Sequence, residues 1–102
     1  MGYGGELLSY ALNQRVWKAG KAVLTVPGSG SLTTVNVSVS GLSKANDVVL
    51  ITLDRNGQTA VNPIALPYVY QVTDLTSFDV GLNLENADPS DKTCFLNWTV
   101  LR

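Results

Sequence analysis

Eight residues decide the fold class of this chain: Thr33-Thr-Val-Asn-Val-Ser-Val-Ser40. Val35, Val37 and Val39 alternate with small polar residues. This period of two places one row of side chains on a core and the other row in water. Because β-branched residues also suit a pleated, half-buried surface, the segment predicts a β-strand that covers one side of a small core.

Similar short segments recur through the rest of the chain, separated by turn residues about every eight to twelve positions. The segments with strand-like composition are 21–26, 32–40, 48–53, 68–73, 77–83 and 93–101, with a short return strand near 59–61. Alternation in 77–83 predicts Phe78, Val80 and Leu82 inward and Asp79 outward, and in 68–73 it places Tyr68, Tyr70 and Val72 on one face. This spacing is typical of an antiparallel sandwich or a small barrel. We therefore predict an all-β fold for residues 20–102, a small antiparallel β-sandwich that is jelly-roll-like.

Two local signals predict how some of these strands connect. Asn56-Gly57 is a strong hairpin signal because both residue types accept the positive φ of a tight turn. Strand 48–53 is therefore expected to turn back onto a strand near 59–61. Pro63 and Pro67 cannot donate hydrogen bonds to a sheet, so residues 62–67 are expected to form a surface loop.

Some strands carry more apolar side chains than one interior can bury. Strand 48–53 is apolar on both faces apart from Thr52, and strand 93–101 has a core face with Cys94 and Trp98 and a second face that is half apolar. A single small sandwich has one interior, so the surplus apolar groups predict contacts between subunits. The candidate interface residues are Val49, Ile51, Phe95 and Leu101.

Residues 1–19 differ from the rest and are expected to form an N-terminal arm or a short helix. Met1-Gly-Tyr-Gly-Gly5 is flexible by composition, and apolar residues then recur at about three- to five-residue spacing, as on one side of a helix. Such a short helix is not stable alone and must dock, either on its own domain or on a neighbouring subunit or another protein. The candidate contact residues are Leu7, Leu8, Tyr10, Leu12, Val16 and Trp17.

Composition and charge argue against several partners. The chain is 15% charged with a net charge of −1, and its seven Lys and Arg residues do not form the concentrated basic face that nucleic-acid binding requires. No segment approaches the ~20 apolar residues of a membrane span. The first residues lack the features of a signal peptide, and the single cysteine, Cys94, offers no disulfide framework. We therefore expect synthesis in a reducing cytoplasm.

Reactive groups are scarce. The chain contains no His, and most of its eight Asp and Glu residues lie in predicted turns, so we predict no catalytic residue, no cofactor and no metal site. The acidic loop 85–91 is an alternative calcium site, although it lacks the spacing of an established calcium loop. Cys94 is interpreted as a core residue. Tyr68 and Tyr70 follow Pro67 and are the best candidates for exposed aromatic residues in a ligand loop.

Five segments together form a recognisable pattern of strands and turns: Gly20-Lys-Ala-Val-Leu-Thr-Val26, Val37-Ser-Val-Ser-Gly-Leu42, Asp47-Val-Val-Leu-Ile-Thr-Leu53, Tyr70-Gln-Val-Thr-Asp-Leu-Thr-Ser-Phe-Asp-Val80 and Phe95-Leu-Asn-Trp-Thr-Val-Leu101. In this pattern the chain resembles a small β-sandwich module of tailed-phage structural proteins, namely head-decoration (cement) proteins and the heads of phage fibres. Asp54-Arg-Asn-Gly-Gln58 departs from it, since many such modules carry a hairpin rich in Thr, Pro and Gly there.

The resemblance implies a non-enzymatic virion protein that forms trimers. We expect a capsid decoration protein that binds the major capsid protein of the same virus on the outer capsid surface and stabilises the shell. The outer apolar faces would join three copies, and the arm would clasp a neighbour or grip the shell. An alternative is a tail-fibre adhesin or carbohydrate-binding module that holds sugar with Tyr68, Tyr70 and the loop 62–67. A hydrolase is disfavoured because no nucleophile–base pair is evident.

Overall fold

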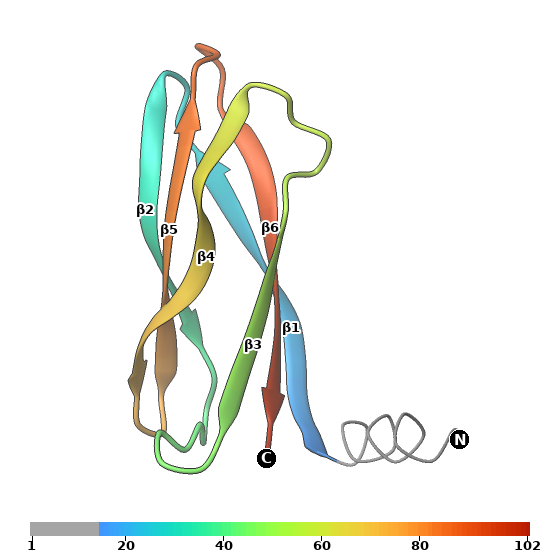
Figure 1. Ribbon diagram of the computed structural model, residues 1–102, viewed down its shortest axis with the longest axis vertical. Helices are drawn as coiled ribbons and strands as arrows, with labels where there is room; N and C mark the ends of the chain where they lie inside the picture. The colour runs from blue at the N-terminus through green and yellow to red at the C-terminus, as the bar shows by residue number, and fades with distance from the viewer. Residues whose placement is uncertain (1–14) are drawn as a thin grey trace, which may run out of the picture.

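The computed structural model describes residues 15–102, except for the side chains of residues 63–65, and this part of the chain forms an all-β fold. Its strands are shown in Figure 1: β1 (Val16–Val26), β2 (Gly30–Ser38), β3 (Val48–Asp54), β4 (Val61–Thr73), β5 (Ser77–Asn86) and β6 (Lys92–Leu101).

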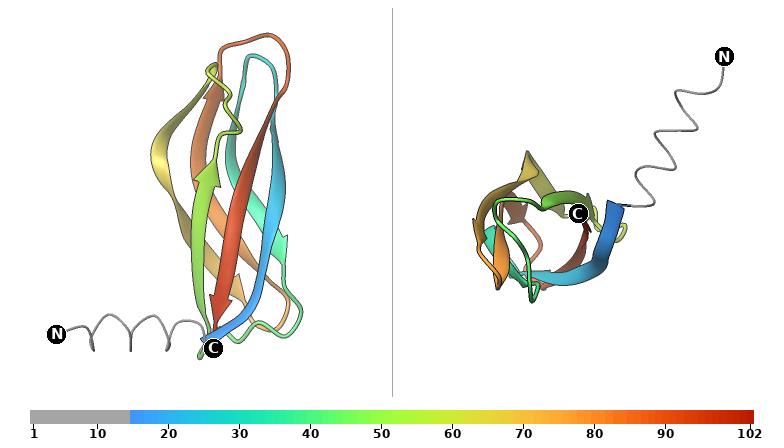
Figure 2. Two further views of the ribbon diagram at one scale, coloured as in Figure 1. Left: turned by 90° about the vertical axis from the view of Figure 1, so that its right-hand side faces the viewer. Right: turned by 90° about the horizontal axis from the view of Figure 1, so that it is seen from below.

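Two three-stranded antiparallel sheets pack against each other. Sheet A has the strand order β1-β6-β3, and sheet B has the order β2-β5-β4. The chain changes sheet at every connection except the turn between β4 and β5. Seen from below, the strands curve around a common interior (Figure 2). The predicted small antiparallel β-sandwich is therefore confirmed.

The first and last strands are neighbours in sheet A. Their pairing runs from Val16 opposite Leu101 to Val26 opposite Lys92, with one irregularity between Val16 and Lys18. As a result β1 begins at the end of the sandwich where the chain finishes (Figures 1 and 2). We call this end the terminal pole.

The core lies between the two sheets and is apolar. Its buried side chains are Leu24, Val26, Val37, Val39, Leu42, Val61, Phe78, Val80, Leu82, Leu84, Cys94, Leu96 and Val100. The inward faces predicted for strands 77–83 and 93–101 are thus confirmed. Each large buried side chain contributes roughly 1.5–3 kcal/mol to folding, so alternation in the sequence translates directly into the stability of the sandwich.

Trp98 is half-buried and packs against the core, and a glycine on the neighbouring strand leaves room for its ring. Gly20 pairs with Trp98, and a Cβ atom at Gly20 would lie 2.6 Å from Trp98 Cζ2. The indole instead meets Phe78 of the other sheet edge-on, with 6.0 Å between ring centroids and 71° between ring planes. Aromatic pairs favour this geometry, so the ring contact helps to fix how the two sheets pack.

The predicted hairpin at Asn56-Gly57 is wrong, although the turn itself is present. Asn56 and Gly57 have φ values of 56° and 68°, as a tight turn requires. However, β3 pairs with β6 in sheet A, whereas β4 pairs with β5 in sheet B. The turn therefore carries the chain from sheet A to sheet B instead of joining two paired strands.

The predicted loop 62–67 is also corrected, since β4 runs without interruption from Val61 to Thr73. This strand lies at an edge of sheet B, where proline is tolerated because one side of the strand needs no hydrogen-bond donor. Its pairing with β5 is irregular at Pro63/Ala65, Ala65/Tyr68 and Val69/Gln71. The prolines therefore lie within an irregularly paired strand and do not end it.

The sandwich also begins earlier than residue 20, since β1 starts at Val16. Val16 and Trp17 thus belong to sheet A and not to a helix. The other residues assigned to the arm, namely Leu7, Leu8, Tyr10 and Leu12, lie outside the described residues.

Candidate functional site

The outer face of sheet A carries aliphatic side chains beside the terminal pole. Val16 and Val48 both pair with Leu101, which places three aliphatic residues in one row across the sheet. Ala19 and Leu50 flank Thr99 in the next outward row. Val16, Val48 and Leu50 are 47%, 44% and 49% exposed, whereas Leu101 is buried. We call Val16, Ala19, Val48, Leu50 and Leu101 the aliphatic patch.

The predicted interface residues lie differently from what the sequence indicated. Val49 and Ile51 are half-buried and pack against the core, so they point inward. Phe95 and Leu101 do lie on the outer face, but Leu101 is buried and the ammonium of Lys21 stands 4.7 Å from the centre of the Phe95 ring. The exposed aliphatic residues of β3 are instead Val48 and Leu50. Both faces of this strand are apolar, so the sequence did not show which face the packing of the two sheets would bury.

Tyr68 and Tyr70 are exposed on the outer face of sheet B, at 54% and 63%. Tyr68 pairs with Gly81, and its ring lies directly over that glycine, since a Cβ atom at Gly81 would stand 2.3 Å from Tyr68 Cζ. Glycine at this position thus lets an aromatic ring rest on the backbone of β5. Both tyrosines lie in the segment 68–73 that the sequence predicted as a strand, now the last part of β4, and this gives them defined positions.

A bulge in β4 brings Tyr70 and Gln71 to this outer face together. Val69 pairs with Val80 and Gln71 pairs with Asp79, so β4 has one residue more than β5 between these pairs. Val69 and Val72 still pack against the core on either side of the bulge. Bulges re-aim side chains in this way, and this one breaks the alternation that would have placed Tyr68, Tyr70 and Val72 on one face.

A polar cluster lies beside the tyrosines, and its members were not identified from the sequence as parts of one site. Asn36 Nδ2 donates hydrogen bonds to Asp79 Oδ1 at 2.7 Å and to Ser77 Oγ at 3.1 Å. Alternation alone indicated that Asp79 faces outward, but the pairing of β2 with β5 is what brings Asn36 opposite it. We call Asn36, Tyr68, Tyr70, Gln71 and Asp79 the tyrosine face. A hollow of about 650 Å³ runs along the β4 edge beside Tyr70 and Gln71.

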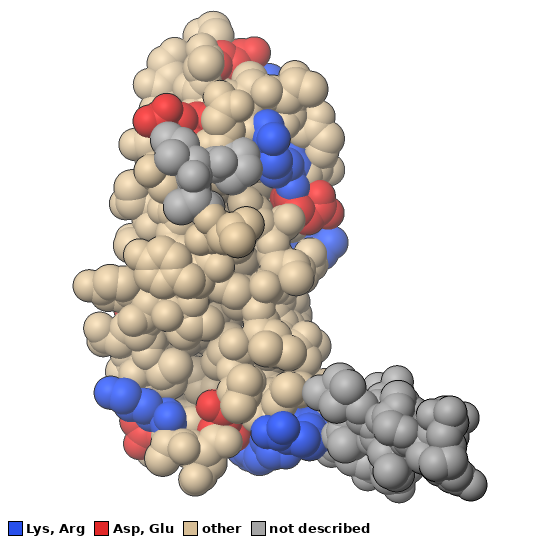
Figure 3. Space-filling model, viewed as in Figure 1, with Lys and Arg blue, Asp and Glu red and all other residues tan. Residues whose placement is uncertain are grey.

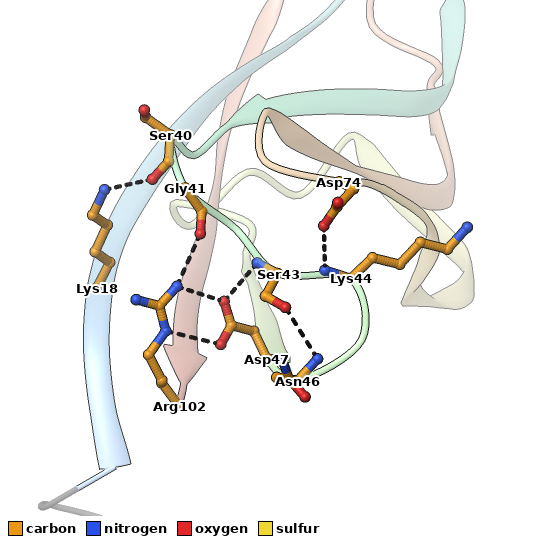
Figure 4. A network of polar contacts seen from close by, with 9 residues as sticks. All are labelled: Lys18, Ser40, Gly41, Ser43, Lys44, Asn46, Asp47, Asp74 and Arg102. Carbon is orange, nitrogen blue, oxygen red and sulfur yellow. Dashed lines mark hydrogen bonds and ion pairs between the residues drawn. The ribbon is translucent and has the colours of Figure 1, made fainter.

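The terminal pole is held by a polar network around the last residue (Figure 4). Arg102 donates from Nε to Asp47 Oδ1 at 3.1 Å, and from Nη2 to Asp47 Oδ2 at 3.0 Å and to the carbonyl of Gly41 at 2.9 Å. The guanidinium also stacks 3.4 Å above the centre of the Trp17 ring. These contacts connect the end of β6 to β1 and to the loop between β2 and β3.

Asp47 is the acceptor at the centre of this network, and its side chain has no exposed surface. The hydrogen bond from Arg102, followed by the one from the Ser43 N–H, holds the pKa of Asp47 below its usual value. The carboxylate therefore stays charged down to acidic pH. Trp17 is covered by this network, which indicates a structural role for this member of the predicted arm.

The acidic loop 85–91 uses its carboxylates to hold its own backbone. Asp88 Oδ1 accepts hydrogen bonds from the backbone N–H and the hydroxyl of Ser90, and these lower the pKa of Asp88 to about 2. Asp91 Oδ1 accepts from the N–H of Gly28 in the neighbouring turn. Across residues 15–102, no group of three or more Cys, Asp or Glu side chains is arranged to hold a metal ion.

Cys94 lies in the core, where burial raises the pKa of its thiol. A thiol that resists ionisation is a poor nucleophile, in keeping with its interpretation as a core residue.

Charged side chains are sparse in the middle of the face of the sandwich that Figure 3 shows. In the view of Figure 3, Lys, Arg, Asp and Glu gather toward the two ends, and the middle of the surface over β3 and β4 shows none. β4 contains no charged residue at all. In the part of the chain that the structure describes, no helix has the length and apolarity needed to span a membrane.

No family model, no curated protein and no solved structure matches this chain.

Proposed function

We propose that this protein is a non-enzymatic capsid decoration (cement) protein of a tailed phage. It is synthesised in the host cytoplasm, binds the major capsid protein on the outer capsid surface as a homotrimer, and stabilises the shell. The resemblance of residues 20–102 to phage head proteins motivates this function. The observation that carries it is the aliphatic patch, an exposed apolar surface on a small and weakly charged domain.

The patch is suited to contacts between copies of the chain. Val16, Val48 and Leu50 come from the two outer strands of sheet A and flank the buried Leu101 on β6. Apolar side chains at the centre of an interface, surrounded by a polar rim, are typical of stable oligomers. Thr52, Asn97 and Lys21 form the next outward row and would supply that rim.

The position of the patch also suits attachment to a shell. It adjoins the terminal pole, where β1 begins, and the arm residues Leu7, Leu8 and Leu12 precede β1 in the sequence. Three arms that each bind weakly to neighbouring capsid subunits would together bind tightly, because each additional contact forms within one complex. The opposite pole would then face outward from the particle.

Light scattering behind a sizing column tests the trimer. The wild-type protein is expected at three times its chain mass of 10.9 kDa. Leu50→Asp places a charge in the patch and is expected to weaken self-association at least about 30-fold, as loss of a central interface residue does. Val23→Asp is the matched control, because Val23 is 65% exposed on the same outer face but pairs with Phe95, away from the patch. A wild-type monomer at high micromolar concentration would remove the trimer.

Co-sedimentation with undecorated capsids of the same virus tests the partner. The wild-type protein is expected to sediment with the capsids and to raise the temperature at which they break open. The arm variant Leu8→Asp/Leu12→Asp is expected to lose capsid binding while its thermal unfolding stays unchanged. Failure of the wild-type protein to bind capsids would contradict the proposed function.

A further inference from the structure

We propose that the tyrosine face binds a neutral carbohydrate, with Tyr68 and Tyr70 against the C–H face of a sugar ring and the Asn36–Asp79 pair against its hydroxyl groups. This inference concerns the outer face of sheet B and is independent of the capsid proposal, which concerns sheet A and the arm. It rests on one juxtaposition: aromatic rings and an oriented amide–carboxylate pair lie side by side on adjacent strands.

The Tyr68 ring is held in place while most of the residue remains in contact with water. It lies over the backbone of Gly81, where no side chain can push it away, and 54% of the residue is exposed. An aromatic ring that already rests on a rigid strand loses little freedom when a ligand covers it. Its exposed surface is apolar and therefore suits the C–H groups of a pyranose, while the phenol hydroxyl can hydrogen-bond at the rim.

The bulge enlarges this surface. If β4 had regular alternation after Val69, Tyr70 would face outward and Gln71 would face the core. Instead, Tyr70 and Gln71 are both exposed opposite Asp79, while Val69 and Val72 keep their core contacts. The strand therefore gains one polar, hydrogen-bonding side chain on its outer face without losing an apolar one inside. Gln71 supplies both a donor and acceptors.

The orientation of the Asn36 amide is determined by its partners. A carboxylate can only accept hydrogen bonds, so the Nδ2 atom of Asn36 must face Asp79 Oδ1, and it also donates to Ser77 Oγ. Both amide protons are then in use, and the Asn36 carbonyl oxygen is left as an acceptor. Asp79 has a second carboxylate oxygen for the same purpose. Two neighbouring acceptors of this kind suit the hydroxyl groups of a sugar, which can donate a hydrogen bond to each.

The charge of this face selects the chemistry of the ligand. β2, β4 and β5 contain no Lys or Arg, and their two charged residues, Asp79 and Glu85, are acidic. These strands therefore offer none of the basic side chains on which phosphate binding relies. The hollow beside Tyr70 and Gln71 extends this surface along the edge of β4, and Lys44 from the loop between β2 and β3 also lines it. An uncharged ligand with one apolar face and several hydroxyl groups can contact both the tyrosine rings and the amide–carboxylate pair.

Titration of the ¹⁵N-labelled full-length protein tests this site. The probes are the methyl glycosides of glucose, galactose, mannose and N-acetylglucosamine, each taken to high millimolar concentration so that a site with a Kd as weak as roughly 1 mM is still saturated. The expected result is that at least one glycoside shifts the amide signals of Asn36, Tyr68, Tyr70, Gln71 and Asp79 in a saturable manner. No saturable shift with any of the four probes, or shifts confined to sheet A or to the loops, would overturn the proposal.

Variants assign the binding to these side chains. Tyr68→Ala is expected to weaken binding of the responding glycoside about tenfold, a loss of about 1.4 kcal/mol, because the apolar ring that would cover the C–H face of the sugar is removed. Tyr68→Phe keeps the ring and should retain most of the affinity. Phe95→Ala is the matched control, because it removes an aromatic ring from the outer face of sheet A. Equal affinity of Tyr68→Ala and the wild-type protein, with both folded by thermal unfolding, would also overturn the proposal.

Discussion

The two outer faces of this sandwich differ although their inner faces are alike. Both sheets turn Val, Leu and aromatic side chains toward one core. Outside, sheet A presents the aliphatic patch with Val48 and Leu50, whereas sheet B presents tyrosines beside an amide–carboxylate pair. An aliphatic surface suits another protein surface, and an aromatic surface with oriented polar groups suits a small hydroxylated ligand. In a fold held by one core, the outer faces are where function can diverge.

Both outer faces depend on the same core, so removing its largest buried side chain should disrupt the aliphatic patch and the tyrosine face together. Phe78 is fully buried and packs against Trp98. Phe78→Ala is expected to destabilise the protein by roughly 3–5 kcal/mol, because the cavity it leaves cannot collapse completely. Urea unfolding measures this loss, and Phe78→Leu should cost much less. A loss below about 1 kcal/mol for Phe78→Ala would show that this ring does not anchor the sandwich.

Adding a single methyl group at Gly81 should affect the two faces differently. Gly81→Ala would place its Cβ 2.3 Å from Tyr68 Cζ, so the tyrosine must move away from the β5 backbone. Alanine in a strand is otherwise as good as or better than glycine by about 0.5–1 kcal/mol. We expect sugar binding to fall about tenfold, as for loss of the ring contact, while self-association stays unchanged. NMR titration and light scattering on the same sample measure both, and unchanged sugar affinity would contradict the role of the Tyr68 position.

Leu75 lies at the terminal pole, outside both faces, and its substitution is expected to change stability less than the substitution of Phe78. It has a φ of 67° in the turn between β4 and β5, held by a hydrogen bond from its N–H to the carbonyl of Leu42. This conformation costs a non-glycine residue roughly 1–2 kcal/mol. Leu75→Gly is therefore expected to raise the free energy of unfolding by up to about 1 kcal/mol, after the greater freedom of glycine in the unfolded chain is subtracted. A destabilised variant would indicate that the leucine side chain makes a stabilising contact.

Low pH is expected to destabilise the terminal pole and the loop that follows β5 before it affects the apolar core. Hydrogen bonds lower the pKa of Asp88 to about 2 and also lower that of Asp47. A lowered pKa means that the folded state binds protons less readily than the unfolded chain. Its contribution to stability is therefore complete above the ordinary Asp pKa of about 3.9 and is lost as the pH falls from there toward 2.

Thermal unfolding measured between neutral pH and pH 2 checks this expectation. The melting temperature should fall below about pH 4, and the fall should be smaller for Asp88→Asn, whose side chain does not titrate. The same slope in the variant and the wild-type protein would exclude Asp88 as a source of the acid sensitivity.

Much of the fold can be predicted from local sequence patterns without knowing which strands pair. Alternation at Val35, Val37 and Val39 and along Phe78, Val80 and Leu82 identified strands and their inward faces, because a pleated strand must place every second side chain on the same side. The spacing of turn residues predicted a small all-β sandwich. The scarcity of reactive side chains was the reason for predicting no catalytic site. These conclusions depend only on neighbouring residues and on composition.

Only the tertiary structure decided which strands are neighbours and which face of β3 is buried. Asn56-Gly57 makes a tight turn in isolation, but β3 pairs with β6 because pairing is set by the burial of the whole sheet. Val49 and Ile51 could not be distinguished from Val48 and Leu50 while both faces of the strand were apolar. The tyrosine face likewise needs the pairing of β2 with β5 and the bulge in β4, which bring distant residues together. Local sequence determines which way a side chain points relative to its neighbours, whereas the contacts it makes are determined by chain segments that only the fold brings close.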